Sequence, residues 1–326
     1  MITASSRGRL KHECFTVSQT RCSEPHAAGE ACEYKVAWEI NPHMRRGSVS
    51  PLRAQREHCA LIRCLQRAGA HVEQLPFVHG AFDSVFMKDS AVFVAEHGVR
   101  RALLATFASA ERQQEQGPRA IALGARGFDI RCPSRHPLEG GDTARFRSGE
   151  GLLGYGFRSS ALATSCLESF WEAPVLPLEL VDPWLYHLDT ALTVLNDGTV
   201  LCCRDAFSSG SLRRLERHPA LTELLFVPRA EALRFSLNLI QIGSTVVTGT
   251  ADAPVTKQLL SERGLSVLET PLPQFHLAGG SAACLVGKIY DDAWRTATRE
   301  TTAMRSTSEQ ASVASSSPKT STSSVW

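Results

Sequence analysis

The residues of this chain that could do chemistry are a cysteine, a histidine and several carboxylates that lie far apart in the sequence. Cys284 follows six small residues, Ala278 to Ala283, in LAGGSAACLVG. His187 and Asp189 lie far upstream, in YHLDTALTVL. A cysteine becomes a useful nucleophile when an imidazole moves protons for it and carboxylates hold a cationic substrate in line. The alternative for Cys284 is an inert thiol packed in the core.

Further polar residues stand in or beside strand-like runs. Asp83 and Asp89 occur in FDSVFMKDSAVFV, and Glu139 and Asp142 occur in LEGGDTARF. Arg158 follows in GYGFRSS. Because aspartate is common in turns and glutamate on surfaces, a role in a turn or at the surface is the alternative for each carboxylate.

The composition excludes several classes of protein. The chain has 326 residues, of which 43% are hydrophobic and 21% are charged, and its formal net charge is +2. These values are typical of a globular protein and give no basic footprint for nucleic acid or a membrane surface. No apolar run reaches the ~18 residues that a membrane span needs. We expect a cytoplasmic protein, with an organellar transit segment at the Ser/Thr-rich N-terminus as the alternative.

The ten cysteines do not predict a disulfide framework or a zinc site. They are scattered along the chain, and no pair has CxxC spacing. We therefore expect no metal.

The two ends of the chain differ in composition from its middle. From Thr301 to Trp326, 14 of 26 residues are Ser or Thr, which predicts a disordered tail over 297–326. Residues 1–33 show no clear hydrophobic period, which predicts a poorly ordered segment. The expected folded body is therefore 34–296.

One pattern recurs five times within that body. A helical stretch, such as 52–68 before Gly69, is followed by a break and a short apolar strand, and then by a pair of strand-like runs. Asn196-Asp197-Gly198 predicts a hairpin turn within the third pair. Five units at intervals of roughly 40 to 60 residues favour an α/β fold with radial repetition. A doubly wound sheet is the alternative, but it would need a Gly-rich phosphate loop that the sequence lacks.

The polar residues singled out above come from the first, second, third and fifth strand pairs. In a ring of units, one strand from each would reach the central axis, so these residues would meet in one pocket. Since His187 and Asp189 are two residues apart, a strand would place them on one face.

Five motifs in a fixed order carry a resemblance to a known family. FDSVFMKD, LEGGD, GYGFRSS, YHLDTA and GGSAAC together resemble the guanidine-modifying superfamily of arginine deiminases, dimethylargininases and amidinotransferases. INPHM is similar to the opening strand of its arginine dihydrolase and amidinotransferase-like members. The resemblance covers about 35–290. It implies a five-bladed α/β propeller of pseudo-fivefold ββαβ modules, the pentein fold.

The resemblance also implies roles for individual residues. Cys284 would be the nucleophile, His187 the general acid and base, and Glu139 the carboxylate of the deiminase set. The implied substrate-binding residues are Asp83, Asp89 and Asp189 for the guanidinium, and Arg112 and Arg158 for a substrate carboxylate. Thiol, imidazole and carboxylates suffice for this chemistry, so no cofactor is implied.

The motifs also bear on which member of the superfamily this chain resembles. Dimethylargininases usually have His-Leu-Lys where this chain has His-Leu-Asp189, and they often have Asp where it has Gly279. Conversely, DSVF followed by Asp89 is very similar to the dimethylargininase motif, from which Lys88 departs because Glu is common there. Glu139 favours hydrolysis over transfer, since the transferases have Asp.

The resulting prediction is a cysteine hydrolase that acts on arginine or a close guanidino compound and releases ammonia with citrulline or ornithine. The alternatives are a dimethylargininase, an amidinotransferase, and a non-catalytic binding protein on the same fold. The expected partner is a small guanidino molecule, without nucleic acid or membrane. A homodimer is left open.

Overall fold

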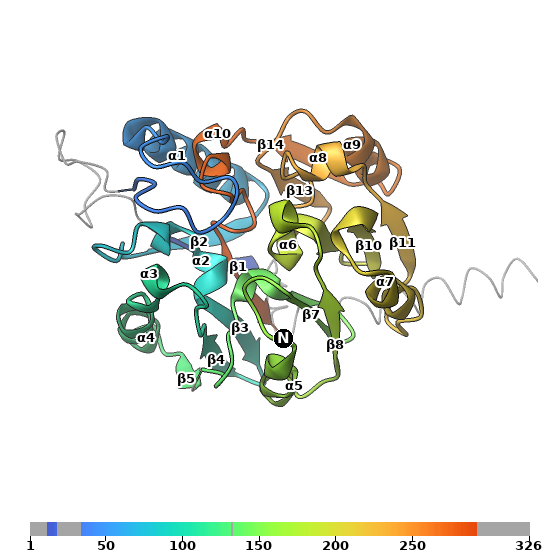
Figure 1. Ribbon diagram of the computed structural model, residues 1–326, viewed down its shortest axis with the longest axis horizontal. Coiled ribbons are helices and arrows are strands. Elements are labelled where there is room, and N and C mark those ends of the chain that lie inside the picture. Colours follow the sequence, from blue (N-terminus) through green and yellow to red (C-terminus); the bar gives the residue numbers. More distant parts are fainter. Residues whose placement is uncertain (1–11, 18–33, 132, 292–326) are drawn as a thin grey trace, which may run out of the picture.

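A computed structural model describes residues 12–17, 34–131 and 133–291 (Figure 1). The predicted tail 297–326 and most of the segment 1–33 lie outside the described residues. Among those that are described, no helix combines the length and apolar character that crossing a membrane requires.

The structure is an α/β fold built from a three-stranded unit that recurs five times. In each unit the first strand is antiparallel to the second, and the second is parallel to the third. The strands are β1 (His12–Val17), β2 (Ala70–Leu75), β3 (Ala91–Glu96), β4 (Val99–Leu104), β5 (Asp129–Arg131), β6 (Thr143–Arg145), β7 (Gly151–Tyr155), β8 (Val175–Glu179), β9 (Leu192–Val194), β10 (Thr199–Cys202), β11 (Glu223–Phe226), β12 (Leu239–Ile242), β13 (Thr245–Thr248), β14 (Ser266–Glu269) and β15 (Gly287–Asp291).

Three units form separate sheets, and the other two share one. The separate sheets are β6-β7-β8, β9-β10-β11 and β12-β13-β14, and the shared sheet has the order β2-β1-β15-β3-β4-β5. Asn196-Asp197-Gly198 joins β9 to β10, and Gly198 has a φ of +87° there, so the predicted hairpin is confirmed.

One strand lies upstream of the predicted folded body. β1 falls inside the segment 1–33, yet it pairs with β2 and β15, and its Phe15 and Val17 are buried. The prediction of a poorly ordered segment is therefore wrong for His12–Val17. Six residues are too few to show a hydrophobic period, and both partners of β1, the strands β2 and β15, lie far from it in the sequence.

The helices lie mainly around the outside of the strand units. Figure 1 shows α1, α4, α5, α7 and α9 at the periphery and α2 and α6 near the centre. The α-helices are α1 (Pro51–Arg67), α2 (Met87–Ser90), α3 (Ala110–Gln113), α4 (Gln116–Gly124), α5 (Thr164–Trp171), α6 (Leu188–Ala191), α7 (Ser209–Glu216), α8 (Arg229–Ala232), α9 (Pro254–Ser261) and α10 (Pro273–His276). The 3₁₀ turns are η1 (Phe82–Val85), η2 (Gly140–Asp142), η3 (Ala161–Ala163), η4 (Pro183–Leu185) and η5 (Arg204–Ala206).

Helix α1 illustrates how an outer helix forms. Proline at its first position fits a helix start, and the buried face recurs at three- and four-residue spacing through Ala54, His58, Leu61, Cys64 and Leu65. The predicted helix 52–68 is thus confirmed to within one residue at each end.

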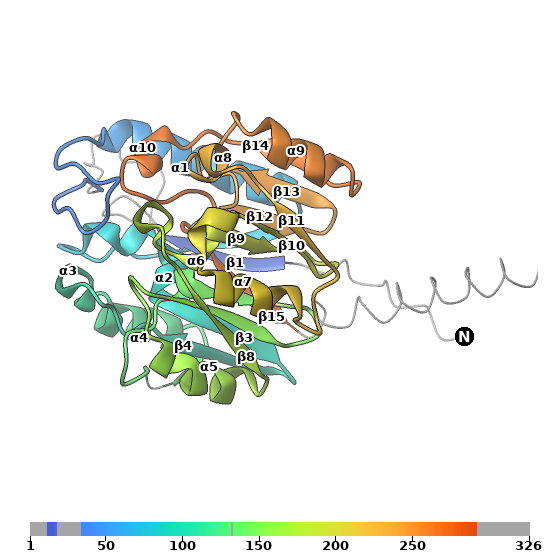
Figure 2. The same cartoon turned by 45° about the vertical axis from the view of Figure 1, so that its right-hand side comes forward.

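Short helical turns precede the first strands of the units and reach the interior. α2 leads into β3, η2 into β6 and α6 into β9, and α2 and α6 both contact η2. In the turned view of Figure 2, α2 and α6 again lie between the outer helices. Asp89 lies in α2, Glu139 is the N-cap residue of η2 and His187 is the N-cap residue of α6, so the fold gathers these side chains at the centre.

Asp189 and His187 do not share a strand face, and that prediction is wrong. His187 is the N-cap residue of α6, and Asp189 lies in its first turn. The turn is held because Leu188 N–H donates to Asp142 Oδ1 at 3.0 Å and the Thr190 hydroxyl donates to the His187 carbonyl at 2.7 Å. The apolar run YHLDTALTVL therefore begins as a helical turn and becomes a strand only at Leu192.

Candidate active site

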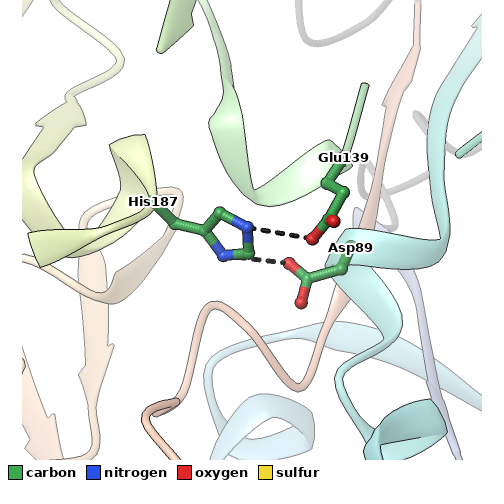
Figure 3. Close-up of side chains that lie close together, drawn as sticks. All are labelled: Asp89, Glu139 and His187. Atoms are coloured by element: carbon green, nitrogen blue, oxygen red, sulfur yellow. Dashed lines mark hydrogen bonds and ion pairs between the residues drawn. The ribbon is translucent and has the colours of Figure 1, made fainter. Parts of the chain in front are cut away.

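A buried histidine lies between two carboxylates at the centre of the fold. His187 Nε2 is 3.1 Å from Glu139 Oε2, and its Nδ1 is 3.6 Å from Asp89 Oδ1 (Figure 3). A Cβ added at Gly141 would clash with both Asp89 Oδ1 and His187 Nδ1. The glycine in LEGGD therefore lets these two side chains approach each other across the backbone of η2.

The charge state of this cluster follows from its surroundings. Burial disfavours the imidazolium, but Asp89, Asp142 and Glu139 outweigh it and raise the pKa of His187 to about 9. Burial likewise opposes a charge on Glu139, but the hydrogen bond from His187 and the guanidinium of Arg158 lower its pKa to about 2. His187 is thus a proton donor near neutral pH, with an ionised carboxylate against one ring nitrogen.

This ion pair predicts a pH dependence of stability. Since the pKa of His187 in the folded state is about 9 against an ordinary value of 6.5, protonation stabilises the fold fully below pH 6.5 and progressively less up to pH 9. We expect the free energy of unfolding by urea to fall across this window, and to fall less steeply in His187→Gln. Equal slopes for the two proteins would contradict the predicted charge of His187.

The candidate nucleophile lies against a second acidic group. Cys284 is buried, and its Sγ is 3.6 Å from Asp189 Oδ2. The same Oδ2 forms an ion pair with Lys88 Nζ at 3.0 Å. Burial, Asp189 and Asp89 together raise the pKa of the Cys284 thiol, whereas Lys88 opposes them. The resting cysteine is therefore a thiol, and an added positive charge beside it would favour the thiolate.

Asp83 lies on η1, close to this group. Its Oδ2 accepts a hydrogen bond from Trp38 Nε1 at 2.6 Å, and burial raises its pKa to about 6. Its Oδ1 is buried and has no hydrogen-bond partner among the described residues, and Asp89 Oδ1 likewise has no hydrogen bond there, although it faces His187 Nδ1 at 3.6 Å. Two acceptor atoms are thus available to the N–H groups of a ligand.

Arg112 has a different position from the one the resemblance implies. Its side chain is buried, and its guanidinium contacts Asp89 Oδ2 at 2.5 Å, Glu115 Oε1 at 2.7 Å and the carbonyl of Asp83 at 3.2 Å. A guanidinium engaged in this way holds the site's own carboxylates. The structure does not place it where it could meet a substrate carboxylate.

Replacing Arg112 by methionine should strongly destabilise the protein. The change leaves the buried carboxylates of Asp89 and Glu115 without their cation, which typically costs about 3–5 kcal/mol. Urea unfolding monitored by circular dichroism would measure the loss. Arg131→Met is the matched control, because Arg131 forms an exposed ion pair with Asp129, and such pairs contribute at most about 1 kcal/mol. Similar losses in both variants would contradict the structural role of Arg112.

Arg158 is buried against Glu139. Its NH1 is 3.4 Å from Glu139 Oε2, its NH2 donates to the carbonyl of Ile40 at 2.9 Å, and its guanidinium lies 5.0 Å from the ring centre of Tyr186. The guanidinium holds Glu139 in place through this contact. The contact between Arg158 and a substrate carboxylate stays a prediction.

Asp89, Glu139 and His187 each offer a ligand atom within 4.8 Å of the others, a spacing that a metal ion could use. Arg112 and Arg158 already contact the two carboxylates. Because a metal ion there would lie next to two guanidinium groups, we interpret the cluster as an acid–base group instead.

The small residues before Cys284 serve the packing of the protein itself. Gly279 has a φ of +85°, and a Cβ there would clash with Asn41, while one at Gly280 would clash with Phe86. The Tyr186 hydroxyl donates to the Gly279 carbonyl at 2.8 Å. This close packing fixes the backbone just before the thiol.

Sequence reasoning missed two contacts of the site. Lys88 was noted as a departure from a pattern and not as a site residue, although it pairs with Asp189. Asn238 was not singled out, although its amide contacts Cys284 Sγ at 3.0 Å. Asn238 stands in SLNLIQI, where an amide between two leucines at the start of a strand-like run is the signal that could have found it.

Comparison with curated proteins finds two kinds of relative. The bifunctional arginine dihydrolase/ornithine cyclodeaminase AgrE of Nostoc sp. is 33% identical over 262 residues, which are 78% of this chain and 36% of AgrE. The N(G),N(G)-dimethylarginine dimethylaminohydrolase of Mycobacterium tuberculosis is 32% identical over 260 residues, which are 79% of this chain and 83% of that protein. The chain thus spans about a third of the bifunctional relative. No protein-family model matches the chain.

Comparison with solved structures finds the same two kinds of relative. The N-terminal domain of ArgZ bound to product, described as an arginine dihydrolase from cyanobacteria, has a TM-score of 0.77 and 26% identity, and the match covers 86% of this chain and 98% of that one. A dimethylargininase (DDAH) from Pseudomonas aeruginosa matches with a TM-score of 0.66 at 16% identity, which supports the fold alone.

Proposed function

Because the chain belongs to the guanidine-modifying (pentein) superfamily, we propose that it is a cysteine-dependent hydrolase of the guanidino C–N bond of arginine or a close derivative. The observation that carries this proposal is the convergence of Cys284, Asp189, His187, Glu139 and Asp89 at the centre of the fold.

The first half of the reaction uses the thiol and the imidazolium. A substrate guanidinium beside Asp189 and Asp89 adds the positive charge that favours the Cys284 thiolate. Sγ attacks the guanidinium carbon, a C–S bond forms, and the C–N bond to one nitrogen breaks. His187 gives its proton to that nitrogen, which leaves as ammonia.

The second half uses the same histidine as a base. Neutral His187 takes a proton from water, and the resulting hydroxide attacks the carbon of the covalent adduct. The C–S bond breaks, the hydroxyl proton of the tetrahedral intermediate passes to the departing sulfur, Cys284 is restored as the thiol, and citrulline is released. Glu139, hydrogen-bonded to Nε2, holds the ring in place and stabilises its charged form in each cycle. A second hydrolysis at the same carbon would give ornithine, carbon dioxide and a second ammonia.

The buried acceptors support a cationic, nitrogen-rich substrate. Asp83 Oδ1 and Asp89 Oδ1 have no hydrogen-bond partner among the described residues, and both point to a ligand that brings N–H donors. Both lie on the first unit, whereas Asp189 comes from the third, so the substrate's nitrogens can be held from two sides.

We also propose that the five strand units form a closed five-bladed α/β propeller whose axis passes through this site. The recurrence of one strand order and the central position of α2 and α6 support it (Figure 1). The propeller would occupy 34–296 together with β1.

A dimethylargininase is the second candidate, and it is favoured by the relative from Mycobacterium tuberculosis. Against it stands the position of Asp189. A carboxylate next to Sγ fits a guanidinium whose nitrogens all carry hydrogens better than one with a dimethylated nitrogen.

The test is to incubate the purified full-length chain separately with arginine, with dimethylarginine, and with arginine plus glycine, and to identify the products by mass. Citrulline or ornithine from arginine alone would support the proposal. Dimethylamine from dimethylarginine alone would favour the second candidate, and product only with glycine would indicate an amidinotransferase. Absence of any turnover would overturn the assignment as an enzyme and favour a binding protein.

A further inference from the structure

The fourth strand unit contributes a residue to the site that no prediction above includes. The other units contribute Asp89, Glu139, His187 and Cys284 through the turns before β3, β6, β9 and β15. Asn238 stands at the equivalent place, immediately before β12, and its side chain is completely buried. With Asn238 included, each of the five units contributes a polar residue from the turn before its first strand.

The orientation of the Asn238 amide follows from its backbone partners. The Cys284 N–H can only donate, and it lies 3.1 Å from Oδ1, so that atom must be the oxygen. The Asp189 carbonyl can only accept, and it lies 3.1 Å from Nδ2, so that atom must be the nitrogen. The second N–H of Nδ2 then faces Cys284 Sγ at 3.0 Å.

This contact matters because of the charges around the sulfur. Asp189 on α6 and Asp89 on α2 disfavour a thiolate at Cys284, as does burial, whereas Lys88 on α2 favours it. Tyr186, from the segment before α6, also lies within electrostatic reach of Cys284. Lys88 is already paired with Asp189, so among the described side chains Asn238 supplies the N–H that donates directly to Sγ. A hydrogen bond to a charged group is typically worth more than one to a neutral group.

We propose that Asn238 is a catalytic residue that holds Cys284 Sγ in place and stabilises its thiolate by direct hydrogen bonding. The catalytic part of this inference rests on the proposed function, whereas the effect on the thiolate does not. When Cys284 ionises, the thiol proton passes to solvent, and the Asn238 N–H remains hydrogen-bonded to the sulfur. By its bond to the Asp189 carbonyl, the same amide also fixes the nucleophile relative to the segment that carries His187.

The decisive variant is Asn238→Asp, which keeps the acceptor for the Cys284 N–H and replaces the donor to sulfur by a carboxylate oxygen. Thiolate formation would be measured by absorbance at 240 nm against pH, subtracting for each variant the same protein with Cys284→Ser. We expect the apparent pKa of Cys284 to rise by at least about one unit, which is a tenfold loss of thiolate at a fixed pH below the pKa.

Two further variants keep the test decisive. If the aspartate variant does not fold, Asn238→Ser serves in its place. It removes the contact with sulfur without adding a charge, and it should raise the thiol pKa by a smaller amount. Ser236→Ala is the matched control, because Ser236 is buried on the same segment and its hydroxyl has no partner among the described residues. It should leave the thiol pKa unchanged. Thermal unfolding of each variant would separate a folding defect from an effect on the thiol.

The outcomes distinguish this inference from the proposed function. An unchanged thiol pKa in folded Asn238 variants would overturn the inference, even if arginine is hydrolysed normally. A raised pKa in a protein that turns over no guanidine would support the effect of Asn238 on the thiolate and overturn the proposed function alone. With turnover present, kcat at pH 7 should fall in parallel with the thiolate fraction while KM changes little.

Discussion

Replacing Cys284 by serine is expected to lower the hydrolysis of arginine by at least about 10⁴-fold, a loss comparable to removing the nucleophile from other covalent catalysts. A serine hydroxyl is a far weaker nucleophile than a thiolate, and the site cannot compensate. His187, the candidate base, is protonated near neutral pH and faces Glu139 and Asp89. It therefore holds its proton for the leaving nitrogen and cannot take one from a hydroxyl.

The fold and the substrate site should survive this change. Sulfur and oxygen differ little in volume, and the Asn238 amide can donate to a hydroxyl as well as to sulfur. Citrulline formation and arginine binding by calorimetry would be measured together, and binding should remain. Cys166→Ser is the control, because Cys166 is partly buried and packs against a different hydrophobic cluster, the one that contains Leu167 and Trp171, and this variant should keep full activity. Substantial turnover by Cys284→Ser would contradict the assignment of the Cys284 thiol as the required nucleophile.

The repeating units could be predicted from sequence because each carries its own local signals. The Asn196-Asp197-Gly198 turn and the amphipathic period of α1 depend only on neighbouring residues. β1 could not be predicted in this way, because its partners β2 and β15 lie outside its own neighbourhood in the chain. A strand of this kind is defined by pairing and not by pattern.

The site, like the fold, was predictable only in part. The motifs identified the polar residues that converge, but not how they are held. His187 and Asp189 were expected on a strand, and a helical turn that depends on the remote Asp142 carries them instead. Arg112 was expected at the substrate, and its place is set by Glu115, three residues away, together with Asp89. Asn238 has no motif at all, since its function depends on a sulfur atom in another unit.

Replacing His187 by glutamine should lower kcat for arginine by about 10²–10⁴-fold, the usual contribution of a general acid–base residue. Glutamine can keep a hydrogen bond to Glu139, so the loss reports proton transfer more than packing. His71→Gln is the control, because His71 is exposed on β2, away from the site, and the variant should behave as the wild type.

The two halves of the proposed reaction need opposite forms of this residue, and that makes the His187 variant informative about mechanism. The imidazolium protonates the leaving nitrogen, and the neutral ring that remains takes a proton from water. A substrate analogue whose leaving group needs no proton should therefore still modify Cys284 in His187→Gln, but hydrolysis of the adduct should be slow. Mass spectrometry of the protein after mixing should then find a persistent adduct on the peptide containing Cys284. Rapid release of that adduct by the variant would show that another group activates the water, and His187 would then be an acid only.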